Sequence, residues 1–377
     1  MKKLISMMAV FALGLFALTG CSSGDKAAFE TTVVAAPETT AAESIAAGSV
    51  AAESAAVESE ATSGESASSK AISDESVSGA VVRIGGLKGP TTMGLVKLMD
   101  DAANKTAKNN YEFTMVTAAD ELTALVAAGK VDIALLPANL ASVLYNKTNG
   151  GVSVIDINTL GVLYLVSSDT SIETVDQLKG KTVYLPGKGT TPEYALRYLI
   201  SASGLSGDDV TLEFKSEASE VASILAEDPT AIGLLPQPFV TSALAQNDKL
   251  SIVMDLTKAW EEYQAEGGGS RLVTGVTIVN NEFLEANTDS VNTFLEEHEA
   301  SILFTESDPD TAAELIAAAG IIPKAPLAKK ALPFCNIKFL SGEEMKAALS
   351  GYLEVLFEQN AASVGGALPD DAFYYMQ

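Results

Sequence analysis

The stretch that decides the fold occurs twice in the chain. It first reads Leu87-Lys88-Gly89-Pro90-Thr91-Thr92, and it returns 100 positions later as Gly187-Lys188-Gly189-Thr190-Thr191-Pro192. Each copy follows an apolar run and leads into a helical pattern. A later apolar run ends at Pro137 after the first copy and at Pro236 after the second, and these prolines are 99 positions apart. Two matches in the same register, with the same predicted elements between them, indicate a duplicated βαβαβ unit.

Strands and helices alternate outward from both copies. Short β-branched runs predict strands, and longer stretches with apolar residues at helical spacing predict helices. Their alternation indicates an α/β architecture with mostly parallel, mixed sheets flanked by helices. The expected strands are 81–87, 111–117, 131–136, 181–185, 210–215, 231–235 and 251–256, and the expected helices are 93–108, 120–128, 192–203, 217–226, 238–246, 290–304, 311–319 and 343–359.

The length after residue 80 exceeds what one hydrophobic core usually holds, so we expect two lobes. Lobe 1 would comprise residues 80–165 and 275–377, and lobe 2 would comprise 166–274. Such a division requires the chain to cross twice between the lobes. We expect these crossing strands near 163–167 and near 274–277, forming a two-strand hinge.

The N-terminal residues predict an exported, lipid-anchored protein. Lys2 and Lys3 precede an apolar run over residues 4–18, which is too short to span a bilayer and is typical of a signal peptide. The sequence Leu18-Thr19-Gly20-Cys21 resembles a bacterial lipobox, which implies removal of residues 1–20 and lipidation of Cys21, with palmitate as one chain. An ordinary signal peptide is the alternative. Residues 21–79 are rich in Ala, Ser and Glu, which predicts a disordered tether.

Charge and composition exclude several classes of function. The formal net charge of -25 argues against binding to nucleic acid, which requires a basic surface. With Cys21 as the anchor, Cys335 has no partner and is expected to be a buried thiol. His298, the single histidine, lies among Glu296, Glu297 and Glu299, which predicts a solvated helix face and argues against a metal site.

Candidate ligand-binding residues follow from the repeated loops. Ligands of open α/β sheets bind beyond the carboxyl ends of strands, where free N–H groups at helix N-termini favour negative groups. Helix capping is the alternative role for each threonine. The loops after Pro137 and Pro236 add polar amides, and one aromatic side chain offers a stacking surface. The candidate set is Lys88, Pro90, Thr91, Thr92, Asn139, Tyr164, Lys188, Thr190, Thr191 and Gln237.

Sequence patterns typical of catalytic and nucleotide-binding sites are incomplete in this chain. Gly187-Lys188-Gly189 lacks the Ser or Thr that follows the lysine of a phosphate-binding loop. Gly180-Lys181-Thr182 has the required order, but Val175 occupies the position of the glycine that begins such a loop. The chain has no Gly-x-Ser-x-Gly elbow, and a Ser-His-Asp triad would depend on His298. We therefore expect neither an enzyme nor a cofactor.

The chain from about residue 81 resembles a family of transport proteins. The segments that carry this resemblance are Gly85–Pro90, Ala127–Ala134, Val175–Val183 and Val364–Tyr375. They are similar to the nitrate/sulfonate/taurine and thiamine-pyrimidine class of ABC transporter substrate-binding proteins. The resemblance implies a two-lobed periplasmic-binding-protein type 2 fold, with ligand contacts from the first loop of each lobe.

Together these observations predict an extracytoplasmic, monomeric lipoprotein that delivers a small molecule to an ABC permease and ATPase. The expected ligand is a sulfonate, an oxyanion or a pyrimidine-type vitamin precursor, bound by hinge closure. Two alternatives remain at the level of sequence. One is a surface lipoprotein that senses a ligand, and the other is an enzyme on the same fold.

Overall fold

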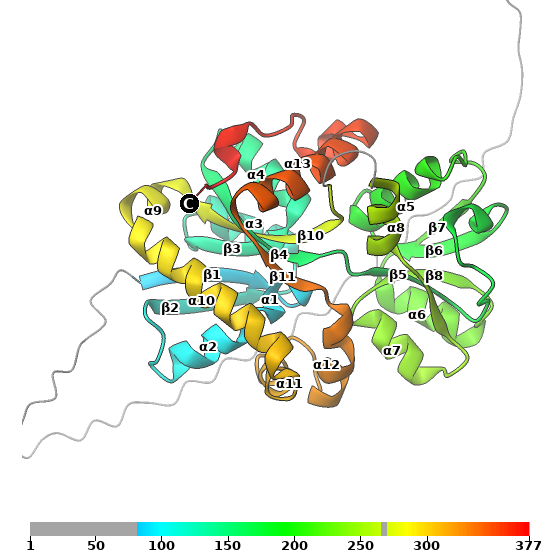
Figure 1. Ribbon diagram of the computed structural model, residues 1–377, viewed down its shortest axis with the longest axis horizontal. Coiled ribbons are helices and arrows are strands. Elements are labelled where there is room, and N and C mark those ends of the chain that lie inside the picture. Colours follow the sequence, from blue (N-terminus) through cyan, green and yellow to red (C-terminus); the bar gives the residue numbers. More distant parts are fainter. Residues whose placement is uncertain (1–80, 265–269, 377) are drawn as a thin grey trace, which may run out of the picture. The chain divides into compact units, whose positions relative to one another are not determined.

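The computed structural model describes residues 81–264 and 270–376, which belong to one compact unit. The predicted signal peptide, the lipidation site Cys21 and the tether lie outside the described residues. Within the described ranges the chain forms two mixed sheets with helices on their faces (Figure 1). The α/β fold predicted from the alternating pattern is confirmed.

The first sheet contains both N-terminal and C-terminal parts of the chain. Its strands lie in the order β11 (Ile337–Leu340), β4 (Val152–Leu160), β10 (Val273–Asn280), β3 (Ile133–Pro137), β1 (Val81–Leu87) and β2 (Asn110–Val116). β1 is parallel to β2 and β3, whereas β10 runs antiparallel to β3 and β4. Every residue of β4 is buried, as expected for a strand covered on both faces.

The second sheet is built from the middle of the chain. Its order is β7 (Thr211–Lys215), β6 (Thr182–Pro186), β8 (Ile232–Pro236), β5 (Leu163–Ser167) and β9 (Ser251–Asp255). β6 is parallel to β7 and β8, and β5 is antiparallel to β8 and β9. The sheets are less parallel than the sequence suggested, because β5 and β10 are each antiparallel to both neighbours.

The duplicated unit has the same topology in both sheets. In each sheet the three strands of the repeat are parallel, with the first strand in the centre. The next position is taken by an antiparallel strand from elsewhere in the chain, β10 in the first sheet and β5 in the second. The chain passes from β4 to β5 through Gly161 and Val162, and it returns to the first sheet where β10 begins.

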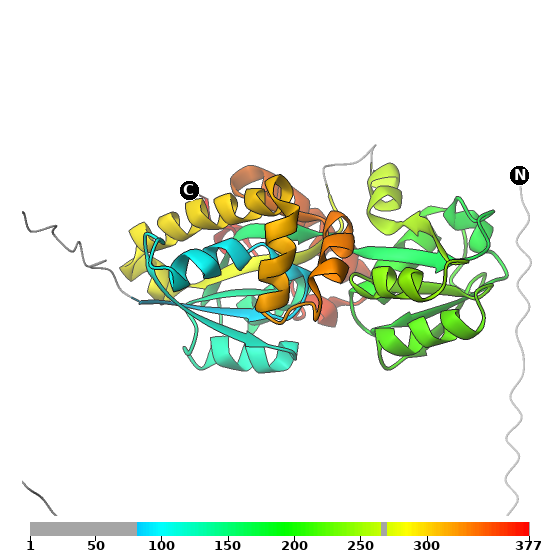
Figure 2. The same cartoon turned by 90° about the horizontal axis from the view of Figure 1, so that it is seen from below.

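The helices cover both faces of the sheets. In Figure 2, α2, α10 and α11 lie on one face of the first sheet and α3 lies on the other. The helices are α1 (Pro90–Met93), α2 (Val96–Ala103), α3 (Ala119–Ala127), α4 (Ala138–Lys147), α5 (Thr191–Ala202), α6 (Ala218–Glu227), α7 (Phe239–Gln246), α8 (Leu256–Gln264), α9 (Asn281–Ala286), α10 (Thr288–Ser307), α11 (Pro309–Ala318), α12 (Ala325–Ala331) and α13 (Gly342–Gln359). Short 3₁₀ helices are η1 (Val175–Leu178), η2 (Leu332–Phe334), η3 (Ala361–Val364) and η4 (Asp371–Phe373).

The predicted helix over residues 93–108 is two helices in the structure. α1 begins at Pro90 and ends at Met93, and α2 ends at Ala103, just before Lys105 with a φ of 59°. A left-handed residue at this position terminates a helix. Thr91 and Thr92 therefore lie inside α1 instead of preceding a helix, and both are buried.

The single histidine is buried, which corrects the prediction of a solvated position. The His298 side chain is 0% exposed, and its Nδ1 lies 3.2 Å from Oδ2 of the buried Asp156. Its ring stacks on Phe294, with a centroid separation of 5.2 Å. Side chains four positions apart share a helix face, so His298 belongs to the buried face of Phe294 and not to the face of its exposed neighbours Glu296 and Glu299.

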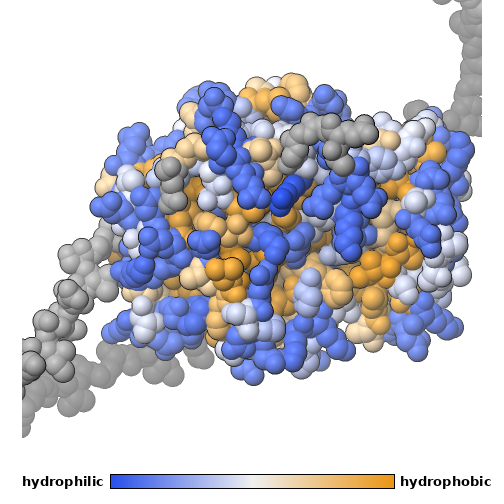
Figure 3. Space-filling model, in the orientation of Figure 1, coloured by the Kyte–Doolittle hydropathy of each residue, from blue (hydrophilic) through white to orange (hydrophobic). Residues whose placement is uncertain are grey.

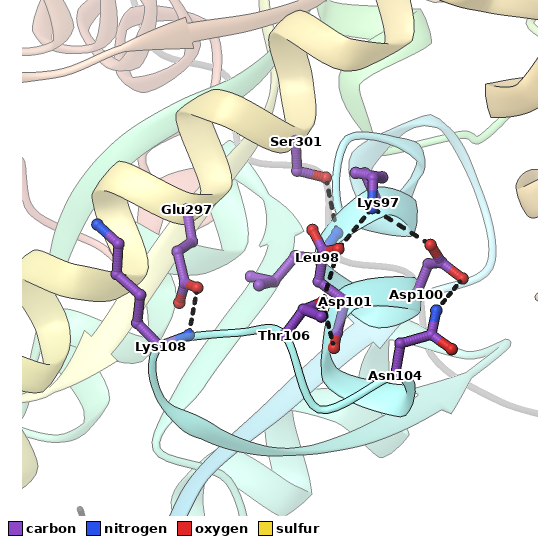
Figure 4. Close-up of polar contacts among 9 residues, drawn as sticks. All are labelled: Lys97, Leu98, Asp100, Asp101, Asn104, Thr106, Lys108, Glu297 and Ser301. Atoms are coloured by element: carbon purple, nitrogen blue, oxygen red, sulfur yellow. Dashed lines mark hydrogen bonds and ion pairs between the residues drawn. The ribbon is translucent and has the colours of Figure 1, made fainter. Parts of the chain in front are cut away.

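Helix α10 is fixed to α1 and α2 by polar contacts (Figure 4). The Ser301 hydroxyl donates to the Gly94 carbonyl at 2.6 Å. It accepts from the Leu98 amide at 3.1 Å, the contact that Figure 4 draws. One turn earlier on α10, the Glu297 carboxylate accepts from the Lys108 amide at 2.6 Å. The Ser301 contacts satisfy backbone groups at the end of α1 and the start of α2 that have no partner within their own helix. The Glu297 contact satisfies the amide of Lys108, in the loop between α2 and β2.

Replacing Ser301 by alanine is expected to destabilise the protein by roughly 1–3 kcal/mol, because the buried Gly94 carbonyl and Leu98 amide both lose their partner. Urea unfolding measures this loss. The matched control is Ser307→Ala on the same helix, because Ser307 is exposed and its hydroxyl donates only to its own helix at Phe304. Equal stability of the two variants would contradict the assigned role of Ser301.

Candidate functional site

A cavity of about 300 Å³ lies between the two sheets. The carboxyl ends of β3 and β8 border it, together with the N-terminal residues of α4 and α5 and the first crossing segment. Loops at the carboxyl ends of strands are the usual ligand-binding positions of α/β folds. The lining residues are Ala119, Pro137, Asn139, Leu140, Val162, Leu163, Thr190, Thr191, Pro192, Pro236 and Thr274.

The turn before α5 is preformed. Gly187 and Gly189 have φ values of 76° and 75°, which glycine adopts without strain. The Thr190 hydroxyl donates to the Gly187 carbonyl at 2.6 Å, and the Gly189 amide donates to the Glu193 carboxylate at 2.7 Å. Thr190 is the N-cap residue of α5, so the helix begins at Thr191, one position earlier than predicted. One backbone N–H group of this turn, that of Gly189, is thus already paired with an acidic side chain.

Both polar walls of the cavity are held by the C-terminal part of the chain. On the first-sheet side, Asn139 Nδ2 donates to the Ser363 carbonyl at 3.2 Å. On the second-sheet side, the Tyr352 hydroxyl donates to Thr191 Oγ1 at 3.1 Å. Burial raises the pKa of Tyr352, so its phenol stays protonated and remains a donor at neutral pH.

The same segment also contacts the body of α5. Gln359 Nε2 donates to the Tyr194 carbonyl at 3.0 Å, and Asn360 Nδ2 donates to the Tyr194 hydroxyl at 2.9 Å. The rings of Trp260 and Tyr352 pack with their centroids 5.8 Å apart. Trp260 is fully buried, so it is a core residue and not a stacking surface for a ligand. The two walls therefore share one support, the C-terminal segment that contains Tyr352 and Ser363.

The polar groups of the cavity are hydroxyls and an amide. Thr274 Oγ1 is buried and has no hydrogen-bond partner among the described residues. A buried polar atom without a partner costs free energy, about 1–3 kcal/mol. None of the lining residues is ionisable, and most are proline or aliphatic. This cavity suits a small molecule with an apolar or ring-shaped body and few polar atoms.

Three of the ten candidate residues line the cavity, namely Asn139, Thr190 and Thr191. The loop of the first copy does not line it. Lys88 is exposed, and Pro90 is the first residue of α1. The Thr92 hydroxyl donates to the carbonyl of Leu87, the last residue of β1, at 2.5 Å. Thr91 is buried, and it packs closely against Gly275 of β10.

The other candidates also lie outside this cavity. The Tyr164 hydroxyl donates to the Phe334 carbonyl at 2.9 Å, because Tyr164 and Leu163 point to opposite faces of β5. The Lys188 ammonium lies over the Phe214 ring, 5.7 Å from its centroid. Gln237 lines a different cavity. The roles of these residues in ligand binding stay predictions.

Most lining residues were not among the candidates, and they include Leu140, Pro192 and Thr274. Leu140 belongs to α4, a helix that the sequence analysis did not identify. Thr274 was noted only as part of a crossing strand, although that placement was itself a signal, because a crossing strand borders both sheets. Pro192 follows the threonine pair directly.

Other kinds of site find little support in the described residues. His298 is fully buried against Asp156 and does not line the cavity, so it is not placed to serve a Ser-His-Asp triad there. Among the described residues, no cluster of three or more His, Cys, Asp or Glu is arranged to hold a metal ion. Within the same residues, no helix is both long enough and apolar enough to cross a membrane. Cys335 is buried, as predicted, and burial raises the pKa of its thiol to about 12.

Comparison with known proteins assigns a family and a fold. A family model described as NMT1/THI5 like matches residues 110–312. No curated protein matches the chain. An ABC transporter structure from Parabacteroides distasonis is similar, with 24% identity and a TM-score of 0.66, over 79% of this chain and 99% of that one.

Two further structures share the fold. The periplasmic aliphatic sulphonate binding protein SsuA from Escherichia coli has 16% identity and a TM-score of 0.62, over 80% of this chain and 94% of that one. The ligand binding component of an ABC-type import system from Staphylococcus aureus, solved with zinc bound, has 14% identity and a TM-score of 0.57, over 78% and 96% of the two chains. At these identities the likeness concerns the fold alone.

The first crossing between the sheets is tightly packed, which generates a prediction. A Cβ at Gly161 would lie 2.2 Å from Thr257 Oγ1 and 2.8 Å from Leu272 Cδ2. Gly161→Ala is therefore expected to destabilise the protein by about 1–3 kcal/mol through overpacking. Chemical denaturation measures the change. Gly207→Ala is the control, since a Cβ at Gly207 would meet nothing within 4 Å. If Gly161→Ala cost no more than this control, the close packing of the crossing would be wrong.

Proposed function

The chain belongs to the NMT1/THI5-like family, and from this membership we propose that it is an extracytoplasmic solute-binding lipoprotein that delivers a small molecule to an ABC importer. It works as a monomer, and the permease and ATPase of the importer are its partners. The observation that carries the proposal is the cavity between the sheets, with walls from both copies of the repeat.

The position of the cavity supports ligand uptake by hinge closure. Its walls come from two sheets that the chain links by short crossing segments, and small changes in such segments reorient whole lobes. Micromolar affinity corresponds to about -8 kcal/mol, more than one helix N-terminus provides. A ligand held in this cavity would gain contacts from Asn139 on one side and from Thr190 and Thr191 on the other.

The chemistry of the walls favours a neutral, ring-bearing ligand over an oxyanion. The cavity has no ionisable lining residue, and Lys88 and Lys188 are exposed elsewhere. The turn before α5 already receives the Glu193 carboxylate, which repels a second negative group. The net charge of -25 provides no long-range attraction for an anion. A pyrimidine-type vitamin precursor therefore fits better than a sulfonate, which remains the second candidate.

A ligand screen tests this proposal. Thermal-shift measurements with pyrimidines, sulfonates, oxyanions and amino acids identify a binder, and calorimetry then gives its affinity. Asn139→Ala and the double variant Thr190→Ala/Thr191→Ala are expected to weaken binding about tenfold or more, since each removes hydrogen bonds from one wall. Ser171→Ala, in an exposed turn of the second sheet's lobe, is the control. Unchanged affinity in both wall variants would place the ligand elsewhere.

The membrane anchor is a separate part of the proposal. The lipobox pattern supports attachment of lipid to Cys21, with residues 21–79 as a tether between the membrane and the binding domain. One acyl chain gives only marginal membrane binding, whereas two or more give a stable anchor. This placement favours an importer or sensor over an enzyme of the cytoplasm. A neighbouring pair of permease and ATPase genes distinguishes importer from sensor.

Replacing Cys21 by alanine is expected to move the protein from the membrane fraction to the soluble exported fraction, because the lipid attachment site is lost. Cell fractionation followed by mass spectrometry of the N-terminal peptide measures both location and modification. Cys335→Ala serves as the control, because Cys335 is a buried thiol of the folded domain. Membrane association that survives in the Cys21→Ala variant would refute the anchor.

A further inference from the structure

Tyr352 supports one wall of the proposed ligand cavity from a buried position behind it. The side chain of this α13 residue is 0% exposed, and its hydroxyl donates to Thr191 Oγ1 at 3.1 Å. Tyr352 is not one of the residues that line the cavity, whereas Thr191 is a lining residue and is partly exposed. Any effect of the Tyr352 hydroxyl on a ligand therefore passes through Thr191.

The surroundings of the phenol set the direction of this hydrogen bond. Burial raises the pKa of Tyr352, so the phenol keeps its proton at neutral pH. A buried donor without an acceptor is unfavourable, and Thr191 Oγ1 is an acceptor within hydrogen-bond distance. A threonine oxygen that accepts the phenol proton keeps its own proton to donate. The Thr191 hydroxyl is thereby held as a donor.

The neighbouring threonine is held in the opposite role. The Thr190 hydroxyl donates to the Gly187 carbonyl at 2.6 Å, so its proton is used and its oxygen is left to accept. The Gly189 amide of the same turn already donates to the Glu193 carboxylate at 2.7 Å, which disfavours an anion here. The α5 wall thus offers a donor at Thr191 and an acceptor at Thr190.

Aromatic packing fixes the position of the Tyr352 ring. Its centroid lies 5.8 Å from that of Trp260, and the Trp260 and Tyr198 centroids are 4.3 Å apart. Trp260 belongs to α8 and Tyr198 to α5, and both α8 and α13 pack against α5 (Figure 1). Trp260 and Tyr352 are fully buried. A donor held by such a fixed group is preorganised, which lowers the cost of ordering it when a ligand binds.

The lining around Thr191 makes a single hydrogen bond more selective. Hydrophilic and hydrophobic residues are mixed on the molecular face in Figure 3, whereas proline and aliphatic side chains form most of the cavity lining. A ligand atom that enters this lining loses water. An analogue that lacks the matching acceptor leaves the protein donor unpaired, and it therefore binds more weakly.

We propose that Tyr352 is a positioning residue that sets the specificity of the cavity, by holding the Thr191 hydroxyl as a donor toward an uncharged acceptor of the ligand. This inference rests on the proposed function, because it takes the cavity between the sheets as the ligand site. The acceptor is a ring nitrogen or a carbonyl oxygen. A compound of the same shape without that acceptor is expected to bind more weakly.

Two probes of matched shape test this role. They are 2,5-dimethylpyrimidine and para-xylene, of which only the first has ring nitrogens that accept hydrogen bonds. Ligand-detected NMR titration of the purified protein measures both affinities, and we expect the unmodified protein to prefer the pyrimidine. Tyr352→Phe keeps the ring and removes the hydroxyl. We expect this variant to bind the pyrimidine about three- to tenfold more weakly and para-xylene with unchanged affinity.

A double variant shows whether Tyr352 acts through Thr191. Thr191→Val alone is expected to reproduce the selective loss, and adding Tyr352→Phe to it is expected to cause no further loss. Thr191→Ser is expected to keep the pyrimidine preference, because Tyr352 still holds its hydroxyl, and it provides the test if Tyr352→Phe does not fold. The control is Tyr198→Phe, which removes a phenol that also packs on Trp260 but is hydrogen-bonded to Gln264.

The outcomes separate this inference from the proposed function. Equal weakening of both probes in Tyr352→Phe would reduce Tyr352 to a packing role. Unchanged pyrimidine affinity in Tyr352→Phe, a further loss in the double variant, or loss of the preference in Thr191→Ser would contradict its action through Thr191. Each of these results leaves the cavity as the ligand site. If the unmodified protein bound neither probe, both this inference and the preference for a ring-bearing ligand would be wrong.

Discussion

The structure depends on an exchange of strands between its two sheets. Each repeated unit provides three parallel strands, and each sheet is continued by one antiparallel strand that the chain contributes from outside that unit. β10 returns from the second sheet to lie between β3 and β4, and β5 leaves the first sheet to lie between β8 and β9. An unpaired central position would leave backbone groups without partners, so the two sheets are complete only when the chain has crossed twice.

The crossings also explain where the site lies. Val162, Leu163 and Thr274 belong to the crossing segments and line the first cavity, so the proposed ligand position includes residues that link the two sheets. In the proposed mechanism, movement of one sheet relative to the other would change the cavity directly. The C-terminal segment strengthens this relation, because it holds Asn139 on one wall and Thr191 on the other.

The sequence predicted the architecture well and the site only in part. The spacing of apolar residues, the residue types in the loops and the repeated segment can be read directly from the sequence. Most strand and helix positions could therefore be predicted from them. β1 at Val81–Leu87 was predicted with its observed bounds. The two loops of the repeat were expected to be equivalent, but only the second one lines the cavity. α1 starts earlier than predicted and buries Thr91 against Gly275, a contact between residues far apart in sequence that no local pattern indicates. His298 was misplaced for the same reason, since its partner Asp156 lies on a distant strand.

The most direct test of the central claim is a crystal structure of the protein with the compound that the screen identifies. We predict electron density for that compound between the sheets, in contact with Asn139 on one side and Thr191 on the other. A compound bound to the outer surface of a single lobe, with no contact from the other sheet, would contradict the account.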